Sequence, residues 1–315
     1  MKRTLLTCVL LTLCFTPACS SATTIQNNKP ADSQAAKKDE GRRRELEERI
    51  GQIAAEAKGH VGVAAVVLET NEEVSLNPHD HFPMQSVYKL PIGMAALRQV
   101  DEGKLKLDER VRVEKNDFVS QRQHSPIRDR NPKGVELSVA ELLLYAVAES
   151  DGTASDVLLK LVGGAGAVSE YLKGIQVSEL VVANSEKEIG GDWETQYRNW
   201  ASPEGATALL RALHERRGLS QQSQALMLKI LTESTPGPKR LKGLLPKGTA
   251  VAHKTGTSGA QGGMTAATND IGLLTLPNGK HVAIAVFVSD SPADEETREA
   301  VIAKVARAVW DAWGS

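Results

Sequence analysis

The chain has 315 residues, of which 41% are apolar and 24% are charged, a balance typical of a globular protein with a sizeable core. The formal net charge is −1 and only 4% of the residues are aromatic, so we expect no nucleic-acid partner. The histidines are scattered, and His79-Asp80-His81 lacks the further ligands that a catalytic zinc site needs. We therefore expect neither a metal nor another cofactor.

Residues 1–22 have the pattern of a secretory signal peptide. Lys2 and Arg3 precede an apolar run at 5–15 that is too short to span a bilayer comfortably, and small residues follow it. We expect export to the periplasm. Cys19 leaves two alternatives open, because it loosely resembles the acylated cysteine of a lipoprotein, whereas plain cleavage near Ala22 gives a free protein.

The two ends of the remaining chain carry the strand patterns. Residues 23–41 are polar without apolar periodicity and predict a flexible linker, and 42–58 have helical spacing. A valine-rich strand at 60–69 and a short strand around Val74 follow. Near the C-terminus, two apolar strands at 271–276 and 281–288 flank Asn278-Gly279 as a hairpin, and 294–313 is an amphipathic helix.

The middle of the chain is mostly helical in pattern. Apolar runs with helical character lie at 91–100, 140–148, 154–162, 206–213 and 223–231. We therefore predict an α/β (α+β) fold in which an antiparallel sheet, built from 42–84 and 232–315, is flanked by helices, and 85–231 is an inserted helical lobe. The two lobes form one catalytic domain, expected to be a monomer, with the site in the cleft between them.

Three short motifs carry the chemistry. In Ser86-Val87-Tyr88-Lys89 a helical start places the lysine amine beside the serine hydroxyl, and a desolvated amine can activate such a hydroxyl as a nucleophile. Ser150-Asp151-Gly152 follows an apolar helix, and Lys254-Thr255-Gly256 lies on a predicted strand at 249–257. Each motif alone is weak evidence, but their order and setting predict that they converge on one cleft.

The three motifs in this order resemble the signature of class A serine β-lactamases, and most closely the extended-spectrum PER-like branch. The resemblance covers roughly 42–313 and rests on the stretches 86–90, 237–246, 253–259 and 266–270. It implies that β-lactam molecules, such as penicillins and cephalosporins, are the substrates. It also implies that Ser86 is the nucleophile, Lys89 its basic partner, and Ser150 the relay of a proton to the lactam nitrogen.

The resemblance further implies how the substrate is held. The substrate carboxylate would lie against the strand that carries Lys254, Thr255, Gly256 and Thr257, and Lys254 would also supply positive potential. Backbone N–H groups of Ser86 and Thr257 would form the oxyanion hole.

The resemblance also implies hydrolysis of the acyl-enzyme, because class A enzymes carry a glutamate that activates the deacylating water on a loop that corresponds to the segment between Ala183 and Pro203. Counting back from Tyr197-Arg198-Asn199-Trp200, Glu186 falls on the position of the general base that activates the deacylating water. Glu188, two residues later, remains the alternative.

Several positions depart from the family pattern. Gly152 replaces the asparagine of the second motif, Gly190 stands where an asparagine often helps to hold the water, and Asn184 and Asn199 replace a frequent salt bridge at the loop neck. The arginine usual beside the third motif is also missing. We expect Arg240 to supply that cation, and His124 to occupy the position of the aromatic gatekeeper at the cleft mouth, although a merely exposed histidine remains an alternative.

Two other functions remain open from the sequence. A penicillin-binding D-alanyl-D-alanine peptidase shares the serine and lysine elements, but it would lack the loop glutamate. A non-hydrolytic exported β-lactam sensor would form the ester without turning it over, and Gly152 with Gly190 keeps this alternative open.

Overall fold

A computed structural model describes residues 31–314, and side chains from Glu40 onward. The predicted signal peptide, with Cys19, therefore lies outside the described residues. The chain divides into Met1–Asp39 and Glu40–Ser315, and the second unit carries every element described below except the first turns of helix α1. Within residues 31–314, no helix is both long enough and apolar enough to cross a membrane.

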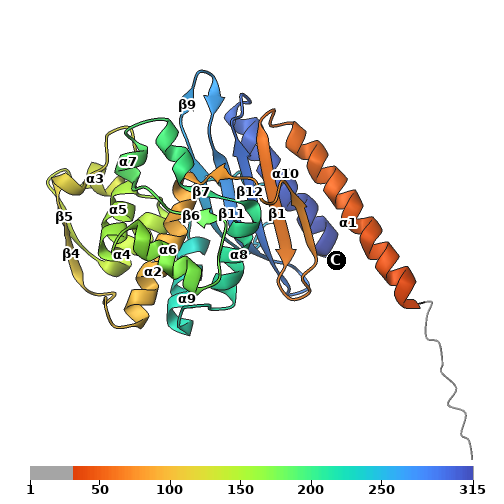
Figure 1. Cartoon of the computed structure of the whole chain (residues 1–315), viewed down its shortest axis with the longest axis horizontal. Helices are drawn as coiled ribbons and strands as arrows, with labels where there is room; N and C mark the ends of the chain where they lie inside the picture. The colour runs from red at the N-terminus through yellow and green to blue at the C-terminus, as the bar shows by residue number, and fades with distance from the viewer. Residues whose placement is uncertain (1–30, 315) are drawn as a thin grey trace, which may run out of the picture. The chain divides into compact units, whose positions relative to one another are not determined.

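The centre of the second unit is a five-stranded sheet in the order β2-β1-β12-β11-β8, and every neighbouring pair is antiparallel. Its strands are β1 (His60–Val67), β2 (Glu73–Leu76), β8 (Val251–Thr257), β11 (Thr268–Thr275) and β12 (His281–Ser289). The middle strands are buried along nearly their whole length, which requires cover on both faces. The predicted sheet from both chain ends is confirmed (Figure 1).

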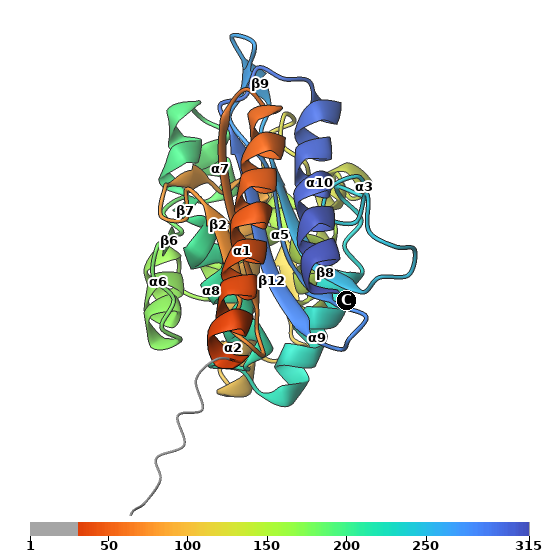
Figure 2. The ribbon, with the colours of Figure 1, turned by 90° about the vertical axis from the view of Figure 1, so that its right-hand side faces the viewer.

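One face of the sheet is covered by two helices from opposite ends of the chain. Helix α1 (Ala31–Ala55) and helix α10 (Glu295–Trp313) run side by side in Figure 2, and their apolar residues share one core with this face. Asp294 caps α10 by accepting a hydrogen bond from the Thr297 N–H. Helix α1 begins at Ala31, not at Arg42, so the linker predicted for 23–41 is too long. Its first turns contain three alanines and two lysines, which favour a helix without an apolar stripe.

The other face carries the helical part of the chain. Helix α8 (Pro203–His214) packs on β1 and β12, and helix α9 (Gln221–Thr232) packs on β8. The remaining helices are α2 (Lys89–Asp101), α3 (Pro126–Arg130), α4 (Val139–Leu143), α5 (Gly152–Leu161), α6 (Ala165–Gly174) and α7 (Glu186–Ile189), with turns η1 (Gln85–Tyr88), η2 (Lys115–Asp117), η3 (Leu144–Ala148) and η4 (Glu194–Arg198). Three short strands form a sheet in which β7 (Trp200–Ala201) lies between β3 (Phe82–Pro83) and β6 (Leu180–Val181). Two further pairs are β4 (Arg110–Val113) with β5 (Val135–Ser138), and β9 (Ala260–Gln261) with β10 (Met264–Thr265).

The backbone is unusual where two of the motifs begin. Gln85, just before Ser86, has a φ of 48°, and Ser150 has a φ of 59°, so both adopt the left-handed conformation that non-glycine residues rarely take. The predicted helix at 140–148 is regular only to Leu143 and continues as the π-helical turn η3. Such strained and π-helical segments concentrate at functional sites, where the surrounding packing maintains them.

Candidate active site

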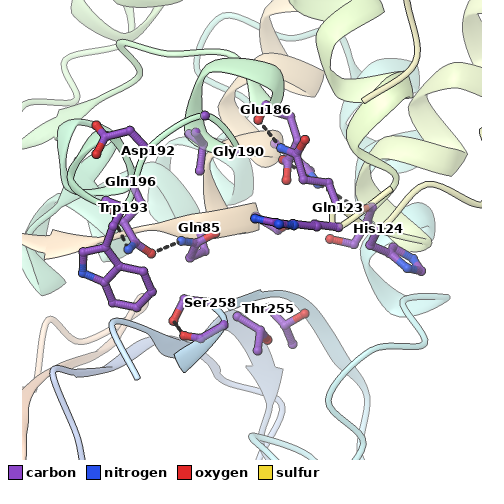
Figure 3. Close-up of a pocket in the computed structure, with 18 of the residues that line it drawn as sticks. Gln85, Gln123, His124, Glu186, Gly190, Asp192, Trp193, Gln196, Thr255 and Ser258 are labelled. Carbon is purple, nitrogen blue, oxygen red and sulfur yellow. Dashed lines mark hydrogen bonds and ion pairs between the residues drawn. The ribbon is translucent and has the colours of Figure 1, made fainter. Parts of the chain in front are cut away.

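A cavity of about 680 Å³ lies between the loop 183–203 and the end of β8. Figure 3 shows Glu186, Gly190 and Trp193 on the loop side, and Thr255 and Ser258 facing them from the sheet side. Of the residues predicted from the sequence, the lining includes Ser86, Lys89, His124, Ser150, Glu186, Thr255 and Thr257. The structure therefore brings together residues from all three motifs and from the loop.

Glu186 and Lys89 form an ion pair at the base of the cavity. The Lys89 Nζ lies 3.1 Å from Oε2 of Glu186 and donates to the backbone oxygen of Ser150 at 2.8 Å. Tyr88 Oη donates to the same Glu186 oxygen at 2.6 Å. Burial alone would raise the pKa of Glu186, but the charge of Lys89 and the hydrogen bond from Tyr88 bring that pKa below its usual value. Glu186 is therefore ionised at neutral pH, as a general base must be.

Ser150 and Lys254 form the second polar pair. The fully buried Lys254 donates from Nζ to the Ser150 Oγ at 2.9 Å and to the Thr255 backbone oxygen at 3.1 Å. Burial, together with the charge of Lys89, lowers the pKa of Lys254 well below its usual value. A lysine that releases its proton readily, hydrogen-bonded to a serine hydroxyl, is suited to proton transfer through that hydroxyl.

The first turn of α7 holds Glu186 in the cavity. The Asp156 carboxylate, on α5, accepts the backbone N–H of Glu186 at 2.6 Å and that of Lys187 at 3.0 Å. Burial, the largest influence, raises the pKa of Asp156 to about 6. Glu188 instead faces the start of the same helix, where its Oε2 accepts the Ser185 N–H at 2.7 Å. The structure thus places Glu186 in the cavity and gives Glu188 a capping position.

A single amide closes the neck of the loop. The fully buried Asn199 accepts the backbone N–H groups of Ala183 and Asn184 at 2.8 Å each, and it donates to the Asn184 backbone oxygen at 2.8 Å. The salt bridge missing from the sequence is therefore replaced here by three hydrogen bonds from one side chain.

The two glycines that depart from the family pattern both leave room for a neighbour. A Cβ placed on Gly190 would lie 2.4 Å from Cδ of Gln123, whose Nε2 donates to the backbone oxygen of Glu186. A Cβ on Gly152 would lie 2.7 Å from Cγ of Glu186 itself. Gln123 therefore occupies the space of a side chain at position 190, and Glu186 occupies the space of a side chain at position 152.

The sheet side of the cavity is stiffened from behind by Arg240. Its guanidinium donates from Nη2 to Thr257 Oγ1 at 2.8 Å and from Nη1 to the Gly256 backbone oxygen at 3.1 Å, and its Nε lies 3.0 Å from the Glu299 carboxylate. Arg240 is buried and is not among the residues that line the cavity. Gly256 is required because a Cβ there would lie 2.2 Å from the Met84 backbone oxygen.

His124 lies at the exposed edge of the cavity, with its Nε2 2.9 Å from the Glu149 backbone oxygen. Tyr88, Gln123 and Asp156 are site residues that the sequence analysis did not single out. Tyr88 lies inside the first motif, at a position to which the sequence pattern assigns no role.

The expectation that no metal is needed stays a prediction. Among the residues that the structure describes, one group has metal-ligating atoms within 4.8 Å of one another, namely Glu69, His214 and His281. None of the three lines the cavity. Glu69 already accepts the backbone N–H of His281 at 2.9 Å and lies 2.7 Å from its Nδ1.

An antiparallel sheet, an inserted helical part, and a cavity lined by Ser86, Lys89, Ser150 and an ionised glutamate together define a class A serine β-lactamase, a hydrolase of the PER-like branch. The model of the β-lactamase enzyme family matches residues 45–313, and the chain belongs to that family.

Known relatives agree in sequence and in fold. The chain is 45% identical to the extended-spectrum β-lactamase PER-1 of Pseudomonas aeruginosa over 267 residues, which are 84% of this chain and 86% of that protein. It is 38% identical to β-lactamase VEB-1 of the same organism, over 84% of this chain and 88% of that protein. A solved β-lactamase from Chitinophaga pinensis is 46% identical and superposes with a TM-score of 0.83, covering 85% of this chain and 99% of the other.

Proposed function

We propose that this β-lactamase opens the lactam ring with Ser86 and clears the resulting ester with a water molecule that Glu186 activates. The observation that carries the proposal is the placement of an ionised Glu186, paired with Lys89 at 3.1 Å, in the cavity that Ser86 lines. A penicillin-binding peptidase has no need of this carboxylate.

Acylation uses the serine and the two lysines. Lys89 passes a proton to Glu186, and the neutral amine then removes the proton of the Ser86 hydroxyl as Oγ bonds to the lactam carbon. The carbon–nitrogen bond breaks, and the nitrogen takes a proton from Ser150, which Lys254 replaces. The proton held by Glu186 then returns through Lys89 and Ser150 to Lys254, which leaves Glu186 ionised for deacylation. The contact of 2.9 Å between Lys254 Nζ and Ser150 Oγ supports this route. Backbone N–H groups of Ser86 and Thr257 stabilise the oxyanion.

Deacylation uses Glu186. Its carboxylate takes a proton from water as the water oxygen bonds to the ester carbon, and the Ser86 oxygen leaves with a proton returned to it. The substrate carboxylate lies against Thr255 and Thr257, with Arg240 and Lys254 behind them as the positive charges. His124 borders the substrate side chain at the cavity mouth.

A matched pair of loop variants tests this proposal. Glu186→Gln should slow deacylation by about 10²–10⁴ because the general base is lost, whereas acylation should be affected less. Intact mass spectrometry during turnover should then show protein plus one whole β-lactam. Glu188→Gln is the control, because it changes a capping residue of the same loop, and it should turn over nitrocefin almost like the parent.

Two results would contradict the proposal. If the acyl-enzyme accumulates in Glu188→Gln and not in Glu186→Gln, the general base is Glu188, two residues later. A parent protein that gives one burst without turnover would be a β-lactam sensor.

We further propose that the protein is exported, acts as a monomer and needs no metal. The signal-like pattern at 1–22 and the one compact unit from Glu40 support this proposal. The intact mass of the secreted protein distinguishes acylation at Cys19 from plain cleavage near Ala22. Size-exclusion chromatography and activity after dialysis against EDTA test the other two parts.

A further inference from the structure

One oxygen of Glu186 receives both of the described hydrogen-bond donors to its carboxylate. Tyr88 Oη is 2.6 Å from Oε2 and Lys89 Nζ is 3.1 Å from it. The Tyr88 contact has the short length of a hydroxyl bonded to a charged acceptor. Tyr88 is fully buried, and burial, then the charge of Glu186, raises the pKa of its hydroxyl well above the usual value. The hydroxyl therefore remains a donor at every pH at which the enzyme works.

Gly152 provides the space into which this bond draws the carboxylate. A Cβ at position 152 would approach Cγ of Glu186 to 2.7 Å and its Cδ to 3.2 Å. Ordinary Cβ contacts are longer, so any side chain at this position would displace Glu186 from Tyr88. The third neighbour of the ideal Cβ is the His124 backbone oxygen at 3.3 Å, which leaves little room for the new side chain to turn away.

We propose that Tyr88 is a positioning residue for the general base, matched to the missing side chain at Gly152. Tyr88 and Lys89 together hold Oε2, so that Oε1 is the oxygen that accepts the proton of the deacylating water. The inference rests on the proposed function of Glu186 and adds to it a joint role for two residues: a hydroxyl at 88 and no side chain at 152.

The charged surroundings of Glu186 determine how the loss of this bond would appear. Lys89 and Lys254 face Glu186 from α2 and β8, Asp156 faces it from α5, and Tyr88 faces it from η1. Burial raises the pKa of Glu186, whereas the two lysines and the Tyr88 hydroxyl lower it. Without the hydroxyl, the pKa of Glu186 rises, and the protonated, inactive carboxyl persists to higher pH.

The variant Tyr88→Phe removes the hydroxyl and keeps the ring. We expect kcat to fall by about tenfold, the size of a hydrogen bond to a charged group, with acyl-enzyme accumulating in the intact mass. The acylation rate constant should stay near that of the parent. The acid limb of the pH profile of kcat should move to higher pH. Tyr171→Phe is the matched control, because it removes another buried tyrosine hydroxyl that does not line the cavity, and it should behave like the parent.

Gly152→Ala tests the other half of the pair. The added methyl group should displace Glu186 and slow the same deacylation step. In the double variant the losses should not multiply, because the alanine has already separated the carboxylate from the hydroxyl that Tyr88→Phe removes. Gly152→Ala also leaves the Tyr88 side chain intact, so it keeps the test usable if Tyr88→Phe folds poorly in a thermal melt.

The outcomes separate this inference from the proposed function. If Glu186→Gln traps the ester but Tyr88→Phe keeps the parent kcat and pH profile, Glu186 is the base and the positioning role is wrong. A fall in kcat without movement of the acid limb would also overturn it, since a purely structural role would act in that way. If Glu186→Gln does not trap the ester, the proposed function itself fails.

Discussion

The two sides of the cavity are held in place by different kinds of bond. On the sheet side, Lys254 and Thr255 lie within β8, whose backbone pairs with β11 along seven residues from Val251 to Thr257. On the loop side, Glu186 belongs to a four-residue helix, and its position depends on the side chains of Asp156, Tyr88 and Gln123.

This difference indicates how the work of the enzyme is divided. On the sheet side, a backbone ladder fixes Lys254 and Thr255 almost regardless of their neighbours. Deacylation relies on a few side-chain bonds, each of which one substitution can remove. We therefore expect changes on the loop side to affect the second step selectively, and changes on the sheet side to affect substrate binding and the first step.

The largest effect should come from removing the nucleophile that both sides serve. Ser86 is the only serine in the chain followed by lysine three residues later. Ser86→Ala should abolish covalent labelling by a fluorescent penicillin, measured on a denaturing gel. Ser258→Ala, which changes another serine of the same cavity, should still be labelled. Labelling that survives in Ser86→Ala would place the nucleophile elsewhere, and the two sides of this cavity would then not serve the two steps of one reaction.

A smaller effect is expected on the sheet side from Arg240→Ala. The guanidinium braces Thr257 and adds positive charge behind the carboxylate site. Its loss should lower kcat/KM by about 10- to 100-fold, equivalent to about 1.5–3 kcal/mol for a charged hydrogen bond. Substrates that lack the carboxylate should lose much less. Arg240→Lys is the control that keeps the charge without the forked geometry.

An equal loss for both kinds of substrate would contradict the electrostatic role of Arg240. The side chain would then act only through the stability of β8, which a thermal melt would report. The deacylation rate constant should change little in either case, because Arg240 has no contact with the loop 183–203 in the described hydrogen bonds.

The same contrast explains how much the sequence could predict. The five-stranded sheet, most helices and the spacing within the three motifs follow from local patterns, since a helical turn fixes the spacing of Ser86 and Lys89 and a strand fixes Lys254 to Thr257. The roles of these residues are implied by the family resemblance. The family resemblance then supplied Glu186, and the structure places that residue, and not Glu188, in the cavity.

What the sequence did not predict depends on long-range side-chain contacts. Tyr88 and Glu186 are 98 residues apart, and Gln123 and Glu186 are 63 apart, so no periodicity connects them. From the sequence alone, Gly152 and Gly190 indicate only the loss of an amide side chain at each position. Their real consequence, room for Glu186 and Gln123, becomes visible only when the neighbours are placed in space. The position of Arg240 behind the strand also depends on tertiary packing.

The smallest expected effect concerns stability on the loop side, where Asp156 anchors the start of α7. Folding raises the pKa of Asp156 to about 6, chiefly through burial, so the native state holds this proton more tightly than the unfolded chain does. The contribution of this group to the free energy of unfolding is therefore fully present below about pH 4, the unfolded pKa, and is lost as the pH rises through about 6.

Asp156→Asn removes this titration while keeping one acceptor oxygen for the loop. The free energy of unfolding of the parent and of the variant should be measured with urea between pH 4 and 7. The difference between the two should change with pH, by less than about 1.4 kcal/mol per pH unit, the limit for one proton. The parent should lose stability relative to the variant as the pH rises. Asp192 is an exposed carboxylate of the same loop, and its hydrogen bonds to Thr195 lower its pKa. Relative to Asp192→Asn, the parent should therefore gain stability, not lose it, as the pH rises. If the Asp156→Asn and parent curves stay parallel, the Asp156 carboxylate is no harder to ionise in the folded protein than in the unfolded chain, and the loop is anchored without an electrostatic cost.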